Sequence, residues 1–152
     1  MHRWVDGKYL GVVLMCAAAL SFVSCENHDD NATTVGVTLR EFSVTPDHSS
    51  APAGVITFEV SNAGEDMHEF LVIKTNLAPD ALPTESNGSY EEDGAGTELL
   101  DEIEEIDPGG SAELSLDLEA GHYVLICNMV HVEEVEVEVH YALGMRTAFT
   151  VE

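Results

Sequence analysis

The sequence predicts an all-β protein, folded as an antiparallel Greek-key β-sandwich or barrel. Short runs of valine, isoleucine, leucine and aromatic residues recur through the chain, and turn-forming residues separate them at intervals of about 8–12 residues. The chain contains no Gly-rich phosphate loop, G-x-S-x-G elbow, C-x-x-C pair or H-E-x-x-H motif. Nucleotide-binding and hydrolase functions therefore have no sequence basis, and we expect a protein that is not an enzyme.

The first expected strand spans residues 35–44. Val35, Val37 and Leu39 alternate with less apolar residues, and the pattern changes phase before Phe42 and Val44, which predicts a bulge or bend. Further strands with turn signals at their ends are expected at residues 55–60, 67–74, 111–118, 122–127 and 146–151.

Residues 75–106 are less regular. Residues 75–96 are rich in proline, aspartate, serine, asparagine and glycine, which predicts a long loop. Apolar residues at positions 99, 100, 103 and 106 favour a short helix near 97–106, although an irregular strand is also compatible with this spacing.

The charge is strongly negative, with 29 acidic against 5 basic residues and a net charge of −24. Such a chain repels nucleic acid and anionic membranes, so we expect neither as a partner. The acidic surface fits two explanations equally: adaptation to a salt-rich environment, or docking of a partner with a basic surface.

The N-terminus has the features of an export signal. Arg3 and Lys8 precede an uncharged apolar segment at residues 9–23, which is too short to span a membrane comfortably. The sequence from Phe22 to Cys25 resembles a bacterial lipobox; an ordinary cleaved signal is the alternative. The predicted organisation is a signal peptide at 1–24, a lipidated Cys25 with an acidic tether at 25–34, and one domain at 35–152. We therefore expect an extracytoplasmic protein, periplasmic or on the cell surface, that meets the membrane only through its lipid.

Of the three cysteines, only Cys127 is expected to keep a free thiol in the domain. Cys16 would leave with the signal and Cys25 would carry the lipid, so Cys127 has no disulfide partner. An unpaired thiol outside the cytoplasm is a liability unless it is buried or bound to metal. His131, His140 and Met145 follow it, and a thiolate, imidazoles and a thioether are the donors that favour copper.

Three segments carry a resemblance to the cupredoxin family of blue copper proteins. They are Met67-His-Glu-Phe70, the strand Gly121-His-Tyr-Val-Leu-Ile-Cys127-Asn128, which resembles a G-x-Y-x-x-x-C-N motif, and His140-Tyr-Ala-Leu-Gly-Met145 ahead of the last strand. With the strand pattern, the resemblance covers residues 35–152.

The resemblance implies one type 1 copper site. His68, Cys127 and His140 would form the ligand plane, and Met145 would be the weak axial ligand. Asn128 would brace the site by a hydrogen bond to the thiolate or to the loop backbone.

Twelve residues separate Cys127 from His140, more than in the common loops of the family, and His131 within this insert is a rival ligand. His140 keeps the His-x4-Met relation to Met145 and the Tyr-Ala-Leu-Gly context. An insert can also loop out while its two ends stay fixed, because lengthening a surface loop costs little entropy. These arguments favour His140.

The implied function is electron transfer, by a protein that we expect to be a monomer and to meet redox partners with a basic surface. Two alternatives stay open. A copper chaperone or storage module would use the same residues to deliver Cu(I), and a structural lipoprotein would use the sandwich without metal.

Overall fold

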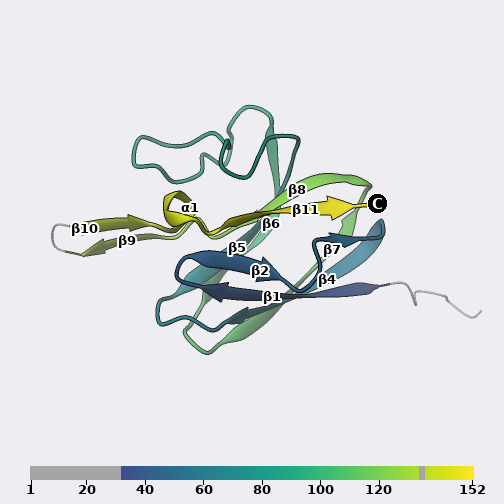
Figure 1. The fold of residues 1–152 in the computed structure, drawn as a ribbon, viewed down its shortest axis with the longest axis horizontal. Coiled ribbons are helices and arrows are strands. Elements are labelled where there is room, and N and C mark those ends of the chain that lie inside the picture. The colour runs from purple at the N-terminus through teal and green to yellow at the C-terminus, as the bar shows by residue number, and fades with distance from the viewer. Residues whose placement is uncertain (1–31, 134–135) are drawn as a thin grey trace, which may run out of the picture.

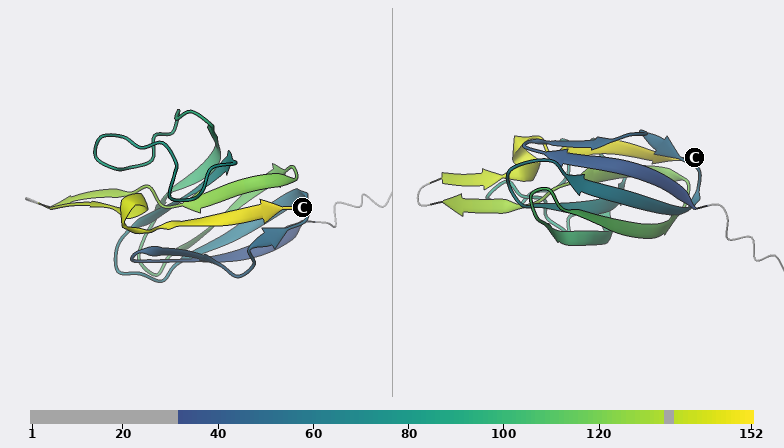
Figure 2. Two further views of the ribbon diagram at one scale, coloured as in Figure 1. Left: turned by 45° about the horizontal axis from the view of Figure 1, so that its top comes forward. Right: turned by 90° about the horizontal axis from the view of Figure 1, so that it is seen from below.

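The computed structural model describes residues 32–133 and 136–152. Within these residues two β-sheets pack face to face, and a separate hairpin projects from one end (Figures 1 and 2). The four-stranded sheet has the order β2-β1-β4-β7 and is formed by β2 Ser43–Pro46, β1 Thr33–Arg40, β4 Gly54–Asn62 and β7 Ser111–Leu118. The predicted all-β sandwich is confirmed.

The second sheet has five strands in the order β3-β11-β8-β5-β6. Its strands are β3 Ser50–Ala51, β11 Arg146–Val151, β8 Gly121–Ile126, β5 His68–Thr75 and β6 Thr97–Ile106. The hairpin consists of β9 Val130–Glu133 and β10 Glu136–Val139, and the helix α1 spans His140–Leu143. None of the described segments is a helix with the length and apolar character needed to cross a membrane.

Most strand pairs are antiparallel, as predicted, but two are parallel: β1 with β4, and β3 with β11. The chain leaves the first sheet after β2, adds β3 to the edge of the second sheet and returns as β4. Such a crossover is what parallel neighbours require.

The phase change predicted within residues 35–44 is a chain reversal. β1 and β2 pair antiparallel, with Arg40 opposite Ser43, so that Glu41 and Phe42 form the turn between them. This turn lies at the end of the sandwich from which the hairpin projects (Figure 1).

The prediction of a short helix near 97–106 is wrong, and the alternative of an irregular strand is confirmed: these residues form the strand β6. β6 pairs with β5 through two register shifts, which move its apolar side chains out of simple alternation. Leu99 packs on the outer face of the sheet, whereas Leu100, Ile103 and Ile106 pack into the core between the sheets. Bulges therefore produced the spacing that resembled a helix.

The sheets enclose a core in which Phe58 packs against Phe70 and Phe149, with ring centroids 5.4 and 5.5 Å apart. The five-stranded sheet is also buried on its outer face, where a second cluster includes Ile73 and Ile126 and is covered from the long loop at residues 76–96 by Tyr90. Burial on both faces explains the unbroken apolar runs at residues 70–73 of β5 and 123–126 of β8.

Residues 1–24 and Cys25, assigned above to a signal peptide and a lipid anchor, lie outside the described residues. β1 begins at Thr33, so the last two residues of the expected tether already belong to the sheet.

Candidate metal centre

The residues of the predicted site lie at one end of the five-stranded sheet. His68 is the first residue of β5, Cys127 follows β8 directly, and Met145 immediately precedes β11. His140 begins the helix α1. Because β8 lies between β5 and β11, these strand ends are neighbours in space although they are distant in the sequence.

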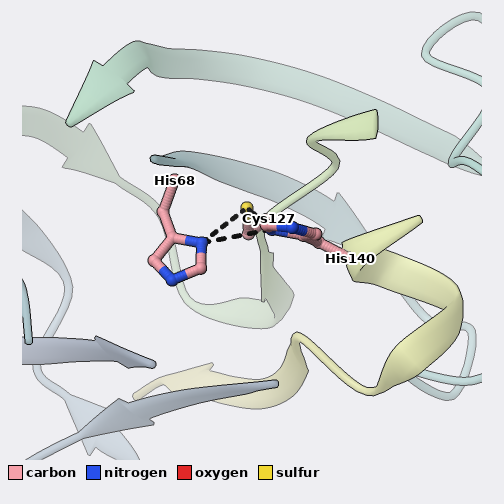
Figure 3. Close-up of side chains that lie close together, drawn as sticks. All are labelled: His68, Cys127 and His140. Atoms are coloured by element: carbon pink, nitrogen blue, oxygen red, sulfur yellow. Dashed lines mark hydrogen bonds between the residues drawn. The ribbon is translucent and has the colours of Figure 1, made fainter. Parts of the chain in front are cut away.

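Three donor atoms converge there (Figure 3). The Cys127 Sγ atom lies 3.4 Å from His140 Nδ1 and 3.8 Å from His68 Nδ1, and the two Nδ1 atoms are 3.1 Å apart. All three side chains have 0% exposure. Among the described residues, His68, Cys127 and His140 form a group able to hold a metal ion.

Backbone hydrogen bonds fix the segments that carry these residues. The Cys127 N–H donates to the Met145 carbonyl, the Met145 N–H donates to the His140 carbonyl, and the His140 N–H donates to the Met129 carbonyl, each at 3.0 Å. The Met145 side chain is fully buried in the same core cluster as Cys127. The structure thus brings Met145 to the site together with the three converging residues.

The insert at 129–139 forms the β9–β10 hairpin, and it places His131 against the site. The ring of His131 stacks on that of His140, with centroids 5.0 Å apart and 9° between the planes, and Phe42 meets His140 edge-on at 5.4 Å. His131 is not a member of the converging group. The structure therefore places His140 inside the converging group and His131 outside it, against the ring of His140.

Burial controls the protonation of the three groups. It raises the pKa of the Cys127 thiol to about 12, against weaker opposing hydrogen bonds from the backbone of Glu69 and Met129. Burial lowers the pKa of His140 to about 4, with a further contribution from His68, and it also lowers the pKa of His68. Near neutral pH both imidazoles are neutral, the form that binds metal, and the thiol must lose its proton to bind.

Asn128, expected to brace the site, forms its side-chain hydrogen bonds with a loop distant in the sequence. Its side-chain oxygen accepts a hydrogen bond from the Tyr90 N–H at 2.6 Å, and its amide group donates to the Tyr90 carbonyl at 3.1 Å. The hydrogen bond to the Cys127 sulfur comes instead from the Glu69 N–H at 3.4 Å. Asn128 thus ties the cysteine segment to the loop at 76–96.

Glu41 is a site residue that the sequence did not indicate. Its Oε1 atom lies 3.1 Å from Nε2 of His68, the nitrogen on the far side of the ring from Cys127. One carboxylate among 29 acidic residues carries no local signal of such a contact.

The donor set fits a first-row transition metal. An ion bound in the plane of two imidazole nitrogens and one thiolate, at about 2.0–2.3 Å, would hold these atoms roughly 3.5–3.8 Å apart. The separations of 3.1, 3.4 and 3.8 Å require only small movements to reach that spacing. Two imidazoles, one thiolate and a nearby thioether are the ligands of type 1 copper.

Comparison with known proteins identifies the family. The family described as Cupredoxin-like domain matches residues 12–137, which is most of the chain. The chain belongs to the cupredoxin-like family. The matched segment contains His68 and Cys127 and ends before His140 and Met145. No curated protein matches the sequence.

Solved structures support the same fold. An auracyanin from the photosynthetic bacterium Roseiflexus castenholzii has a TM-score of 0.54 at 21% identity, covering 80% of this chain and 98% of that one. Auracyanin A of Chloroflexus aurantiacus, described as a "blue" copper protein, has a TM-score of 0.51 at 16% identity, covering 80% of this chain and 99% of that one. Reduced rusticyanin has a TM-score of 0.51 at 17% identity, covering 80% of this chain and 81% of that one. With its fold and its His-Cys-His group beside a methionine, this cupredoxin-like domain fits one type 1 copper.

Proposed function

We propose that this protein carries single electrons through one type 1 copper bound by His68, Cys127, His140 and Met145. The observation that carries the proposal is the convergence of two imidazole Nδ1 atoms and one thiol sulfur in a fully buried position. Bound copper would supply a one-electron couple with a covalent path through the thiolate. The chain would supply ligands held at the ends of β5, β8 and β11 and, for His140, at the start of α1, so that little rearrangement accompanies electron transfer.

Burial of the site favours an electron carrier over copper delivery. A protein that hands Cu(I) to a partner needs ligands that the partner can approach, whereas His68, Cys127 and His140 are each 0% exposed. His131 and Phe42 pack directly on His140. Full burial of these three side chains among the described residues also supports a carrier rather than an enzyme.

Absorption and EPR spectra of the copper-loaded protein test this function. We expect an intense band near 600 nm, typical of thiolate-to-copper charge transfer in the family, and its loss in Cys127→Ser and His140→Ala. The exposed His48 is the matched control, and His48→Ala should keep the band. A colourless protein that binds only Cu(I) would indicate copper delivery, and no copper uptake by the reduced protein would indicate a structural lipoprotein.

We also propose that the domain is an extracytoplasmic lipoprotein anchored through Cys25. The arrangement of the sandwich is compatible with this, since β1 begins at the end opposite the hairpin and the metal centre (Figure 1). An N-terminal anchor would then leave the metal centre directed away from the membrane. Labelling with radioactive palmitate should mark the wild type and Cys16→Ala but not Cys25→Ala; equal labelling of all three would contradict the anchor.

The proposed partners are redox proteins with a basic surface, steered by the net charge of −24. A cationic oxidant such as a hexaammineruthenium(III) complex should oxidise the reduced protein at a rate that falls with added salt. Ferricyanide, which is anionic, should show a rate that rises with salt. Equal salt dependence for the two oxidants would contradict electrostatic steering.

A further inference from the structure

The carboxylate of Glu41 is held in place by the turn that precedes His68. Its Oε1 atom accepts hydrogen bonds from the backbone N–H groups of Glu65 and Asp66, both at 2.9 Å, and the same atom lies 3.1 Å from His68 Nε2. The ring nitrogen has no well-aligned hydrogen-bond acceptor, so its contact with the carboxylate is a close electrostatic one. Glu41 therefore approaches His68 from a fixed direction.

The turn that holds Glu41 is itself constrained. The buried Asn62 donates to the carbonyls of Asp66 and Ile106, at 2.7 and 2.9 Å, and accepts a hydrogen bond from the Gly64 N–H at 2.9 Å. A Cβ atom at Gly64 would lie 2.2 Å from Oε1 of Glu41. The absence of a side chain at Gly64 is thus what allows the carboxylate to lie against this turn.

Only one of the two facing imidazole nitrogens, His68 Nδ1 and His140 Nδ1, can carry a proton in their hydrogen bond. His68 Nδ1 and His140 Nδ1 are 3.1 Å apart, so in the metal-free protein one of them must be the donor and the other the acceptor. If His68 carried its proton on Nδ1, the lone pair of Nε2 would face the Glu41 carboxylate. If His68 carries it on Nε2, the N–H dipole faces the carboxylate favourably, and Nδ1 presents its lone pair to Cys127 and His140.

We propose that Glu41 is a positioning residue of the copper site, which holds His68 in the Nε2–H tautomer and makes its Nδ1 a stronger ligand. This inference rests on the proposed copper function. The contact forms a carboxylate–histidine–metal arrangement, in which the carboxylate fixes the ring and raises the basicity of the ligand. A negative charge beside the site stabilises Cu(II) more than Cu(I), which lowers the reduction potential.

The tautomer can be measured without copper. Long-range ¹H–¹⁵N correlation spectra of the metal-free protein should show His68 protonated at Nε2 and His140 protonated at Nδ1. Glu41→Ala should give a mixture of both His68 tautomers. An Nδ1–H form of His68 in the wild type, or a tautomer unchanged in Glu41→Ala, would overturn the proposal.

Copper binding gives the second measurement. Glu41→Ala should weaken Cu(II) binding by roughly 10- to 100-fold. With Cu(I) affinity unchanged, that loss corresponds to a rise in potential of about 59–118 mV for a one-electron couple. Glu41→Gln keeps an acceptor oxygen of the same shape but removes the charge, so it should shift the potential in the same direction by less. It also keeps the test available if Glu41→Ala does not fold.

Glu65→Gln is the matched control, because it removes a neighbouring exposed carboxylate and leaves its backbone N–H in place. The proposal fails if Glu41→Ala and Glu65→Gln change the potential equally, which would indicate only a general charge effect. Failure of the copper function would look different. In that case the wild type would show no blue band, while the tautomer spectra would still decide the role of Glu41.

Discussion

The imidazole of His131 lies flat on that of His140, with ring centroids 5.0 Å apart and 9° between the planes. His131 comes from the hairpin that the long insert forms, where it pairs across the strands with Glu138. His131, the rival ligand in the sequence, thus packs on the ring of His140 and is not a member of the converging group.

His131→Ala should therefore keep the blue absorption band, whereas His140→Ala should lose it. His131 is outside the group in which His140 Nδ1 lies 3.4 Å from the Cys127 sulfur. Absorption and EPR spectra of the copper-loaded variants check this. Loss of the band in His131→Ala and its retention in His140→Ala would reverse the assignment.

Copper binding should release one proton per ion at mildly alkaline pH. The thiol of Cys127 has its pKa raised to about 12 by burial, while His140, with a pKa lowered to about 4, is already neutral. The apparent Cu(I) affinity, measured with a competing chelator, should rise about tenfold per pH unit between roughly pH 7.5 and 9.5. An affinity independent of pH would mean that the thiolate exists before metal binds; Cys127→Ser should release no proton.

Glu69→Gln should stabilise the metal-free protein at pH 8 but not at pH 4. Burial raises the pKa of Glu69 from 4.5 to about 7, with smaller contributions from neighbouring acids such as Glu102. Between pH 4.5 and about 7, the folded protein therefore binds more protons at Glu69 than the unfolded chain does. The free energy of unfolding falls as the pH rises through that range. Removing the ionisable group should recover on the order of 2–3 kcal/mol at pH 8.

Urea unfolding at the two pH values measures this gain. Glu113→Gln, at an exposed position, is the matched control and should show no such difference between the two pH values. A gain for Glu69→Gln of the same size at both pH values would show that charge is not its cause.

Asn128→Ala should loosen the loop at 76–96. The substitution removes both hydrogen bonds to the Tyr90 backbone and leaves these groups unpaired, at a cost of about 1–3 kcal/mol. Urea unfolding measures the cost, and faster amide hydrogen exchange at Tyr90 locates it. Asn87→Ala, which removes hydrogen bonds only to the nearby Ser89, should leave exchange at Tyr90 unchanged.

Gly64→Ala should displace Glu41 from His68, since the added Cβ would lie 2.2 Å from the carboxylate oxygen. We expect a shift of the potential in the direction of Glu41→Ala with little loss of stability, because the atoms that must move belong to the end of a flexible side chain. Gly121→Ala is the control, because its Cβ would meet no atom closer than 3.8 Å. A normal potential in a folded Gly64→Ala would show that the turn can yield without moving the carboxylate.

The sequence was sufficient for those parts of the site that depend on local motifs. His68, Cys127 and His140 each lie in a short segment typical of their position, and the structure brings all three together. The contact of Glu41 with His68 could not be predicted. It forms where the β1–β2 turn lies against the turn before β5, and a contact between two distant turns leaves no pattern in the local sequence.

The strands, too, could be predicted where the local sequence determines them and not where a partner strand does. Alternation of apolar residues identified β1 and β7, whose inward-facing side chains repeat every second residue. It misread β6, because the register shifts opposite β5 depend on the partner strand rather than on β6 itself.

The three converging side chains come from β5, from the end of β8 and from the segment before β11, and His68 lies 72 residues from His140. In a pleated sheet, a slip of one residue between neighbouring strands turns every side chain to the opposite face. A chain that collapsed with β8 out of register would point Cys127 away from both histidines. The colour of the copper-loaded protein would then report more than metal content, because it would serve as an optical assay of correct strand alignment during refolding.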